Sequence, residues 1–327
     1  MTDLRLKATD IEALTPSIKS FRLVAEDGGP LPAWEAGAHV VFALDVEAGD
    51  LRKSYSLAGD PTDRGSYMTA ILREEGGEGG SKYMHDQVKV GDVLTTTEPQ
   101  NNFPLAKNAK KHLLIAGGIG ITPILAMGRT LRAQGADFHL HYCTKAREDT
   151  AFVAEVEEIF RDGLTFHHDG GDPTKGIKLG QVLAEQEPGT NLYICGPTGL
   201  LGAAREAAGH WAEGTVHFEL FSSARTQEEK QAIAEATSGD ETFEVVLKQS
   251  NTTLTVPPDR SIFEVLRENG VNLPSACEEG WCGNCVATYT AGEVDHRDEC
   301  LDDDERKTQL QTCVSRAKPG QTLVLDL

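Results

Sequence analysis

Four cysteines near the C-terminal end of the chain have a spacing suited to binding iron and sulfur. Three of them, Cys277, Cys282 and Cys285, lie on one short segment, and the fourth, Cys313, follows in a separate segment. This C-x4-C-x2-C…C spacing is typical of a plant-type [2Fe–2S] cluster. Because such a cluster transfers single electrons, we expect the rest of the chain to supply electrons to it and a partner to receive them.

Small residues around these cysteines support the same interpretation. Ala276, Gly280 and Gly283 would let backbone N–H groups approach the sulfurs, and such hydrogen bonds help to set a cluster's reduction potential. A structural zinc site also takes four thiolates, but zinc sites usually carry paired C-x2–4-C motifs, whereas the fourth cysteine stands alone here. The spacing therefore favours iron and sulfur over zinc.

A glycine-rich segment in the middle of the chain has the features of a phosphate-binding turn. Residues 117–123 read GGIGITP and come directly after the apolar residues 113–116. Glycines after a strand permit a tight turn and a close approach of the backbone to a pyrophosphate at a helix N-terminus. The segment ends in Pro123 where the dinucleotide motif has glycine or alanine, so a purely structural glycine turn is the alternative.

A later apolar run ends in Cys195-Gly196-Pro197. A buried structural cysteine is the usual interpretation of such a position. In a single α/β domain, however, both segments would lie at the carboxyl ends of parallel strands, where open α/β sheets bind ligands. The pair of segments therefore indicates a nucleotide site more strongly than either alone.

A third group of polar residues lies nearer the N-terminus. Lys53-Ser54-Tyr55-Ser56-Leu57 places a tyrosine and serines on one expected strand, and Gly80-Ser81 follows later. Such side chains can pack against and hydrogen-bond a flavin ring, and N–H groups near a glycine can hold its phosphate. Taken alone, tyrosine and serine on a strand are more often ordinary sheet residues.

The elements that must position these groups divide into an all-β region and an α/β region. Residues 1–105 contain short alternating runs broken by Gly, Pro and Asp, which predicts a small barrel or sandwich with a short helical segment after the glycines at 76–80. From His112 onward, apolar strands alternate with helices. We expect strands at 138–143 and 191–195 and helices at 123–133 and near 150–160, the pattern of a parallel nucleotide-binding sheet.

The remainder of the chain is predicted to be a linker and a compact mixed domain. Residues 224–240 are polar with few large apolar side chains. After them we expect strands at 243–247, 253–256 and 323–325 and a helix at 262–269, which together with the cysteine segment predict a small α+β domain.

Composition excludes several classes of function. The chain has 327 residues and a net charge of -20, so two or three domains are expected and binding to nucleic acid or an anionic membrane is disfavoured. No apolar run approaches the about 20 residues needed to span a bilayer, and the N-terminus lacks the apolar region of a signal peptide. Seven cysteines, with four in a metal-type pattern, indicate a reducing compartment, and we expect a cytoplasmic enzyme.

The motifs and their order resemble one family over essentially the whole chain. Residues 53–57, 98–105, 117–123 and 195–197 and the C-terminal cysteines occur in the order found in the phthalate dioxygenase reductase and vanillate demethylase reductase family, within the ferredoxin–NADP reductase superfamily. The resemblance implies an antiparallel β-barrel FMN domain at 1–106 and an NAD-binding α/β domain with a parallel sheet at 107–224. It also implies a linker at 225–240 and a β-grasp plant-type ferredoxin domain at 241–327.

The family pattern also implies individual site residues. The Arg-x-Tyr-Ser pattern falls on residues 53–56, with Lys53 in place of the usual arginine, and a lysine offers a point charge without a bidentate fork. Thr122 matches a threonine near the flavin ring, Cys195 lies at the nicotinamide, and Phe221 matches an aromatic residue near the flavin. The cofactor-binding positions implied by resemblance are Lys53, Ser54, Tyr55, Ser56, Ala70, Ile71, Leu72, Arg73, Gly80, Ser81, Gly118, Gly120, Thr122, Cys195, Gly196, Pro197 and Phe221.

The activity implied by the resemblance is a conversion between two-electron and one-electron chemistry. NADH would pass a hydride to FMN, with Thr122 and Cys195 as orienting groups, and single electrons would move through the [2Fe–2S] cluster to a Rieske-type oxygenase. Lys145 and Arg147 could meet a 2′-phosphate, but the family precedent favours NADH over NADPH. An alternative is a self-contained NADH oxidoreductase that reduces another ferredoxin or a small molecule.

Two features near the cluster segment have competing interpretations. Cys300 is also present, and polarity does not distinguish it from Cys313. The family's closing cysteine precedes a Ser-Arg-Ala stretch, which here follows Cys313, so the resemblance implies that Cys277, Cys282, Cys285 and Cys313 are the ligands. The acidic residues 302–305 are most simply a solvated helix start, although a docking face for a basic partner is the alternative.

Overall fold

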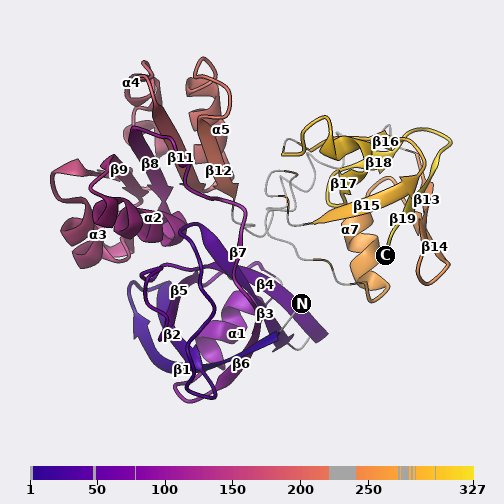
Figure 1. Ribbon diagram of the computed structural model, residues 1–327, viewed down its shortest axis with the longest axis horizontal. Helices are drawn as coiled ribbons and strands as arrows, with labels where there is room; N and C mark the ends of the chain where they lie inside the picture. The colour runs from indigo at the N-terminus through magenta and orange to yellow at the C-terminus, as the bar shows by residue number, and fades with distance from the viewer. Residues whose placement is uncertain are drawn as a thin grey trace. The chain divides into compact units, whose positions relative to one another are not determined.

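The computed structural model describes residues 3–46, 49–77, 79–220, 241–271, 273, 280, 283, 285–298 and 300–327. The chain divides into two compact units, Met1–Phe221 and Ser222–Leu327. Figure 1 labels their helices and strands. In the part of the chain that the structure describes, no helix combines the length and the hydropathy needed to cross a membrane.

The first part of unit 1 is an antiparallel sheet with the order β4-β3-β6-β1-β2-β5, to which β7 adds beside β3. A single bridge between Leu57 and Thr69 joins its two end strands, which makes a nearly closed barrel. Large side chains such as Phe21, Phe42 and Tyr67 fill its interior. The elements are β1 (Asp3–Ala13), β2 (Ile18–Ala25), β3 (Ala38–Val46), β4 (Gly49–Ser56), β5 (Tyr67–Leu72), α1 (Gly80–Asp86), β6 (Val93–Thr97) and β7 (Gln100–Asn101).

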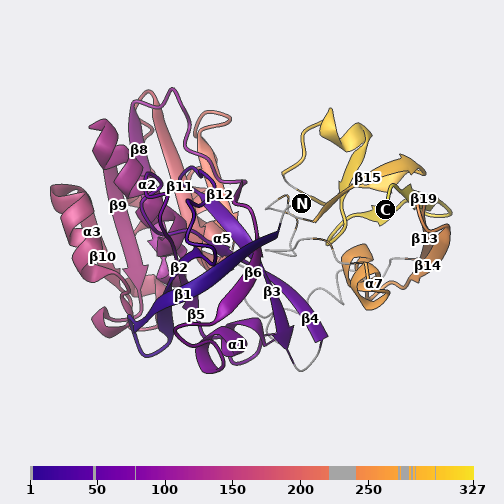
Figure 2. The same cartoon turned by 60° about the horizontal axis from the view of Figure 1, so that its bottom comes forward.

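The second part of unit 1 is a parallel sheet with the order β10-β9-β8-β11-β12, whose strands lie side by side in Figure 2. Helix α2 packs on β8, β9 and β11, and α5 packs on β11 and β12. The elements are β8 (Lys111–Gly117), α2 (Ile121–Gln134), β9 (Asp137–Thr144), α3 (Val153–Phe160), β10 (Leu164–His168), α4 (Leu179–Val182), β11 (Thr190–Gly196), α5 (Thr198–Ala207) and β12 (Val216–Leu220).

The strand order of this sheet reverses between β8 and β11. The chain runs from β8 outward through β9 to β10 on one side, and from β11 to β12 on the other. In doubly wound sheets, ligands bind at the carboxyl ends of the strands at such a switch point. Gly117 ends β8 and Gly196 ends β11, so the two glycine segments meet where a ligand is expected.

Unit 2 contains a mixed sheet with the order β14-β13-β19-β15-β17 and a separate β16–β18 pair. Its helix α7 begins with a capping box, in which Ser261 and Glu264 satisfy each other's backbone N–H groups. The elements are β13 (Phe243–Leu247), β14 (Thr252–Val256), α7 (Ile262–Glu268), β15 (Val286–Ala291), β16 (Val294–Asp295), β17 (Gln309–Gln311), β18 (Arg316–Ala317) and β19 (Thr322–Leu325).

The helices and strands expected from the sequence pattern are confirmed, with small shifts at their ends. The helix expected at 123–133 is α2, the strand at 138–143 is β9, and the strand at 191–195 is β11. The acidic residues 302–305 are exposed and lead into a helical turn, as expected of a solvated helix start, although this turn is a single 3-10 turn, η5 (Glu305–Lys307), rather than an α-helix. Asp302 Oδ1 caps this turn by accepting from the N–H groups of Asp304 and Glu305, each at 2.8 Å. The linker expected at 225–240 lies outside the described residues.

Candidate flavin, nucleotide and cluster sites

The expected flavin strand is β4, at the open edge of the barrel. Tyr55 contacts the ring of Phe42 edge-on, with the ring centroids 5.6 Å apart, and burial raises the pKa of its hydroxyl. Ser56 is buried, and its carbonyl accepts a hydrogen bond from the Thr69 hydroxyl at 2.9 Å. The strand therefore presents an aromatic ring and a serine beside the gap between β4 and β5.

Lys53 lies against the start of helix α1. A Cβ atom on Gly80 would come within 3.0 Å of Lys53 Cγ, so only glycine allows this close approach without a shift. Ser81 Oγ accepts from the N–H of Glu74 at 3.1 Å. Burial raises the pKa of Glu74, while the positive charge of Lys53 opposes that shift. The structure thus brings Lys53, Gly80 and Ser81 together, as the resemblance implied, and adds Glu74.

Strand β5 carries the four expected flavin-lining residues and the start of the following turn. Ala70 and Ile71 are buried and Leu72 is partly buried. Arg73 is engaged elsewhere, since its guanidinium contacts Glu75 at 2.8 Å and Asp86 at 2.6 Å. A phosphate contact by Arg73 would therefore compete with two carboxylates.

The two glycine segments touch at the switch point of the parallel sheet. A Cβ atom on Gly120 would lie 2.2 Å from the carbonyl oxygen of Cys195. A Cβ atom on Gly117 would lie 2.7 Å from Pro197 Cδ, and one on Gly196 would lie 2.9 Å from Gly117 Cα. Side chains at these positions would push the start of α2 away from β11. The glycines therefore keep backbone N–H groups at the surface that a pyrophosphate would need.

Thr122 and Cys195 lie on either side of this contact. Thr122 is buried in the first turn of α2, where its hydroxyl donates to the carbonyl of Ile119 at 3.0 Å. Cys195 is buried at the end of β11. Burial and the nearby carboxylate of Glu219 raise the pKa of its thiol. Cys195 is therefore a neutral thiol, suited to packing against a ring rather than to nucleophilic attack.

Glu219 is a functional candidate that the sequence motifs did not identify. It lies on β12, and the Ser56 hydroxyl donates to its Oε2 at 3.4 Å, which joins the barrel to the parallel sheet. Desolvation by the surrounding protein raises the pKa of Glu219 to about 8, although the hydrogen bond from Ser56 opposes the shift. Glu219 as a whole residue is still partly exposed to solvent. A carboxyl group with a raised pKa thus lies beside Ser56 and Cys195.

In unit 2, two of the four expected cluster ligands are described. Cys285 and Cys313 are both buried, and their sulfurs lie 3.6 and 3.7 Å from the same atom, Gln311 Oε1. Thr312 ties the two segments together, because its N–H and its hydroxyl donate to the carbonyl of Cys285 at 3.1 and 2.8 Å. Two buried thiols that converge in this way fit a thiolate-bound cluster. Cys277, Cys282 and Phe221 lie outside the described residues.

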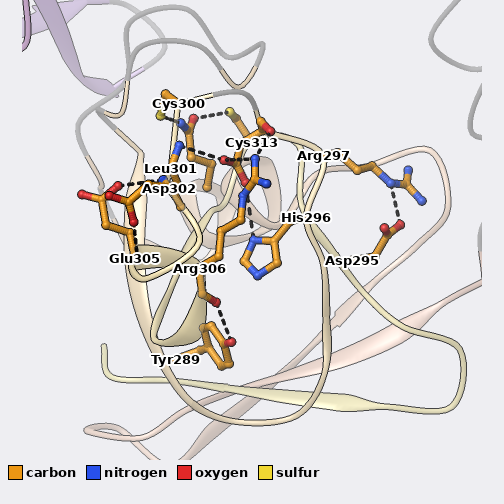
Figure 3. Close-up of polar contacts among 12 residues, drawn as sticks. Tyr289, Asp295, His296, Arg297, Cys300, Leu301, Asp302, Glu305, Arg306 and Cys313 are labelled. Atoms are coloured by element: carbon orange, nitrogen blue, oxygen red, sulfur yellow. Dashed lines mark hydrogen bonds and ion pairs between the residues drawn. The ribbon is translucent and has the colours of Figure 1, made fainter. Parts of the chain in front are cut away.

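A partly buried ion pair lies beside Gly280, within the cysteine segment. The side chain of Asp298 is inaccessible to solvent, accepts from the N–H of Leu301 at 3.1 Å and pairs with Arg306 at 3.3 Å. His296, Leu301 and Arg306, which are labelled in Figure 3, each contact Asp298. Gly280 has a φ of +83°, and a Cβ atom there would lie 3.2 Å from Asp298 Cα. Glycine is thus required at position 280 on both conformational and steric grounds.

Cys300 lies beside the same segment but is exposed. Its sulfur contacts Gln311 Nε2, at the opposite end of the carboxamide from Cys285 and Cys313. It would also lie 3.7 Å from a Cβ atom on Gly283. Figure 3 shows Cys300 and Cys313 on either side of these contacts. Cys313 and Cys285 are thus both buried, whereas Cys300 is exposed.

Sequence reasoning missed Glu219, Gln311 and Thr312 for a common reason. Each acts through a contact with a residue far along the chain, such as the 163 residues between Ser56 and Glu219. A weak signal was available for Gln311 and Thr312, since both directly precede Cys313. Glu219 carried no comparable signal, because a glutamate near the end of a strand is common.

Two family models match parts of the chain. The "2Fe-2S iron-sulfur cluster binding domain" matches residues 245–318, which include all four expected cluster ligands as well as Cys300. The "Dimethylamine monooxygenase subunit DmmA-like, N-terminal domain" matches residues 96–213, which cover most of the parallel sheet. The first match includes the two buried thiols of unit 2, and the second includes the glycine turn after β8 and the end of β11.

Two solved structures are similar to the chain along its whole length. Phthalate dioxygenase reductase, described as a modular structure for electron transfer from pyridine nucleotides to [2Fe–2S], matches with a TM-score of 0.73, 43% identity and coverage of 99% of this chain and 98% of that one. An intact type IV self-sufficient cytochrome P450 monooxygenase matches with a TM-score of 0.80, 35% identity and coverage of 99% of this chain and 41% of that one. These matches confirm the expected barrel, parallel-sheet and ferredoxin architecture.

Relatives of known activity match over the same length. Phthalate dioxygenase reductase of Burkholderia cepacia is 43% identical over 326 residues, covering 99% of this chain and 97% of the relative. Vanillate O-demethylase oxidoreductase of a Pseudomonas species is 38% identical over 329 residues, covering 99% and 98%. The chain therefore belongs to the phthalate dioxygenase reductase family of flavin and [2Fe–2S] oxidoreductases.

Proposed function

We propose that this chain is the NADH-dependent reductase component of a two-component Rieske-type oxygenase. The observation that carries the proposal is the contact between Ser56 and Glu219, which joins the expected flavin strand to the nucleotide end of the parallel sheet. A hydride donor and a flavin must meet within contact distance, and this contact supports two proposed sites that lie next to each other. The cluster-type thiols of unit 2 supply the one-electron outlet.

The flavin site is proposed at the open edge of the barrel between β4 and β5. Tyr55 would pack against the ring, Ser56 would hydrogen-bond its edge, and the backbone of residues 70–72 would line the gap. Lys53 and the N–H groups of Gly80 and Ser81 would hold the phosphate of FMN. Lys53 contributes a single point charge there, so we expect its contact to be weaker than a bidentate arginine contact.

The nucleotide site is proposed at the switch point of the parallel sheet. Backbone N–H groups around Gly118 and Gly120 would receive the pyrophosphate, and Gly196 and Pro197 would line its other side. Thr122 and Cys195 would orient the nicotinamide by packing, because neither is activated as a base or nucleophile. When bound, FMN accepts a hydride from NADH and releases electrons one at a time to the [2Fe–2S] cluster.

The proposal is tested by anaerobic titration of the purified holoprotein with NADH. We expect bleaching of the flavin absorbance followed by the electron paramagnetic resonance signal of a reduced [2Fe–2S] cluster. The four variants Cys277→Ser, Cys282→Ser, Cys285→Ser and Cys313→Ser should lose the cluster but keep flavin bleaching. A Cys313→Ser protein with an unchanged cluster, or a Cys300→Ser protein without one, would overturn the ligand assignment.

Two classes of oxygenase are candidates for the electron acceptor. The relatives named above act with phthalate and vanillate oxygenases, which supports a separate oxygenase as acceptor. The similarity to a cytochrome P450 monooxygenase that carries such a reductase in its own chain supports a haem oxygenase as a second candidate. Stopped-flow reoxidation of the reduced protein by each class of oxygenase distinguishes them, since the true acceptor should reoxidise the cluster faster than the protein reoxidises in buffer.

The same experiment separates the oxygenase reductase from a self-contained oxidoreductase. A self-contained enzyme would turn over NADH rapidly with a ferredoxin or a small molecule and would show no acceleration with any oxygenase. We further propose a cytoplasmic location, because the cluster requires thiolates that an oxidising compartment would convert to disulfides.

A further inference from the structure

The side chain of Gln311 lies at the centre of three cysteine sulfurs in unit 2. Gln311 is inaccessible to solvent. Its Oε1 lies 3.6 Å from Cys285 Sγ and 3.7 Å from Cys313 Sγ. Its Nε2 contacts Cys300 Sγ. The two buried thiols are the proposed cluster ligands, whereas Cys300 is exposed. One carboxamide therefore separates two ligands from a third cysteine.

The backbone holds Gln311 firmly in this position. It is the last residue of β17 and pairs with Val286 of β15, next to Cys285. Its carbonyl accepts from the N–H groups of Val314 at 3.3 Å and Ser315 at 2.9 Å, which closes the turn that carries Cys313. These contacts fix the backbone of Gln311, from which its buried side chain reaches the two ligand sulfurs.

The orientation of the carboxamide depends on the protonation of the sulfurs. In the arrangement described, Cys285 and Cys313 act as thiol donors to Oε1. A cluster takes both sulfurs as thiolates, which have no proton to donate and would repel a carbonyl oxygen. Rotation of the amide by half a turn exchanges its oxygen and nitrogen without changing its shape. The NH2 group would then face the ligand sulfurs, and Oε1 would accept from the thiol of Cys300.

We propose that Gln311 donates a hydrogen bond from its NH2 group to the ligand sulfurs of the cluster and thereby raises the cluster's reduction potential, with the Cys300 thiol holding the amide in that orientation. Reduction adds negative charge to the cluster, so a donor favours the reduced state. Because Gln311 is excluded from water, solvent does not screen this interaction. The inference rests on the proposed ligation by Cys285 and Cys313.

The test is a redox titration of the full-length holoprotein, with the cluster followed by electron paramagnetic resonance. Gln311→Met keeps the length of the side chain but removes both polar groups. We expect the ratio of reduced to oxidised cluster at a fixed potential to fall about tenfold, which is 59 mV for one electron. Gln311→Leu, which also lacks both polar groups, should lower the ratio to a similar extent. Gln309→Leu, on the same strand, is the matched control and should leave the ratio unchanged.

Cys300 is tested in the same way. Cys300→Ser keeps a donor to Oε1 and should leave the potential near that of the wild type, whereas Cys300→Ala should shift it in the same direction as Gln311→Met but by less. The coupling of the cluster to the side-chain amide nitrogen, measured by pulsed resonance methods, should be present in the wild type and absent in Gln311→Leu.

The outcomes separate this inference from the proposed function. A loaded cluster with an unchanged potential in Gln311→Met overturns the inference and leaves the reductase function intact. If Gln311→Met does not retain its cluster, the pulsed measurement on the wild type decides, since the absence of a coupling to the side-chain amide nitrogen also overturns the inference. Loss of the cluster from Cys300→Ser, but not from Cys313→Ser, would instead show that the ligand assignment was wrong.

Discussion

Glu219 combines a shifted pKa with a position between two proposed cofactor sites. Its pKa of about 8 means that the carboxyl group is protonated below pH 8 and ionised above it. Ionisation would place a negative charge beside a flavin that itself gains negative charge on reduction. We therefore expect the rate of flavin reduction by NADH to fall about tenfold as the pH rises through 8, the equivalent of about 1.4 kcal/mol.

The measurement is single-turnover stopped-flow reduction between pH 6 and pH 10. Glu219→Gln retains the shape and a hydrogen-bonding group but cannot ionise, so its profile should lack the step near pH 8. A Glu219→Gln protein with the same step as the wild type would assign the titration to a different group. Ser56→Ala is informative as well, since removal of the hydrogen bond that opposes the shift should move the step to higher pH.

Arg316 is a buried cation that contacts several backbone carbonyls of unit 2. Its guanidinium donates to the carbonyls of Arg260, Glu241 and Pro257 at 2.8, 3.2 and 3.0 Å and lies 4.9 Å from the ring centroid of Phe243. We expect Arg316→Met to leave three carbonyl acceptors without this donor and to destabilise unit 2 by about 3 kcal/mol. Loss of cluster absorbance in urea measures this effect.

The matched control for Arg316 is Arg297, which is exposed and pairs with Asp295 at 2.8 Å. Arg297→Met should change the stability by less than about 1 kcal/mol, because exposed ion pairs contribute little. Equal midpoints for the two variants would show that the buried contacts of Arg316 do not stabilise the unit.

At the scale of elements, the approach of α2 to β11 depends on Gly120. The 2.2 Å distance between a Cβ atom at this position and the Cys195 carbonyl means that Gly120→Ala must displace the start of α2. We expect the Kd for NADH to rise at least tenfold, with smaller effects on flavin content. Gly202→Ala on α5 is the control, since a Cβ atom there meets no atom within 4 Å and should stabilise the helix by about 0.5–1 kcal/mol.

Elements with strong local patterns could be predicted, whereas contacts between them could not. Apolar runs ending in glycine identified β8 and β11, and the cysteine spacing identified the cluster segment. The pairing of Ser56 with Glu219 depends on how a barrel strand packs against a parallel sheet, which no local pattern records. The acidic residues 302–305 had the composition of a helix start, but Asp302 caps a single turn and the chain then enters β17.

The burial of Gln311 illustrates the same limit in unit 2. A glutamine two residues before a cysteine has no distinctive chemistry in the sequence. Its importance comes from the pairing of β15 with β17, which places Cys285 and Gln311 side by side. The resemblance implies that Cys313, and not Cys300, is the fourth cluster ligand. Cys313 is buried whereas Cys300 is exposed, which supports this assignment on physical grounds.

At the scale of the whole molecule, the chain divides into two compact units. Hydride transfer and one-electron transfer can therefore be tested on separate parts of the chain. Unit 1 contains both proposed cofactor sites for hydride transfer, and unit 2 contains the thiols. We expect a fragment of residues 1–224 to retain NADH oxidation with ferricyanide, which accepts electrons directly from a reduced flavin. The same fragment should lose at least 90% of NADH-driven cytochrome c reduction. This loss corresponds to an increase of about 1.4 kcal/mol or more in the activation free energy of electron transfer to cytochrome c.

The control is the full-length Cys285→Ser protein, which lacks a proposed ligand but keeps both units. Its two activities should match those of the fragment, because in each case the outlet for single electrons is missing. If the fragment reduces cytochrome c as fast as the intact chain, electrons leave from the flavin itself, and the cluster is not on the route to that acceptor. If only Cys285→Ser retains cytochrome c reduction, unit 2 contributes by docking the acceptor rather than by carrying the electrons.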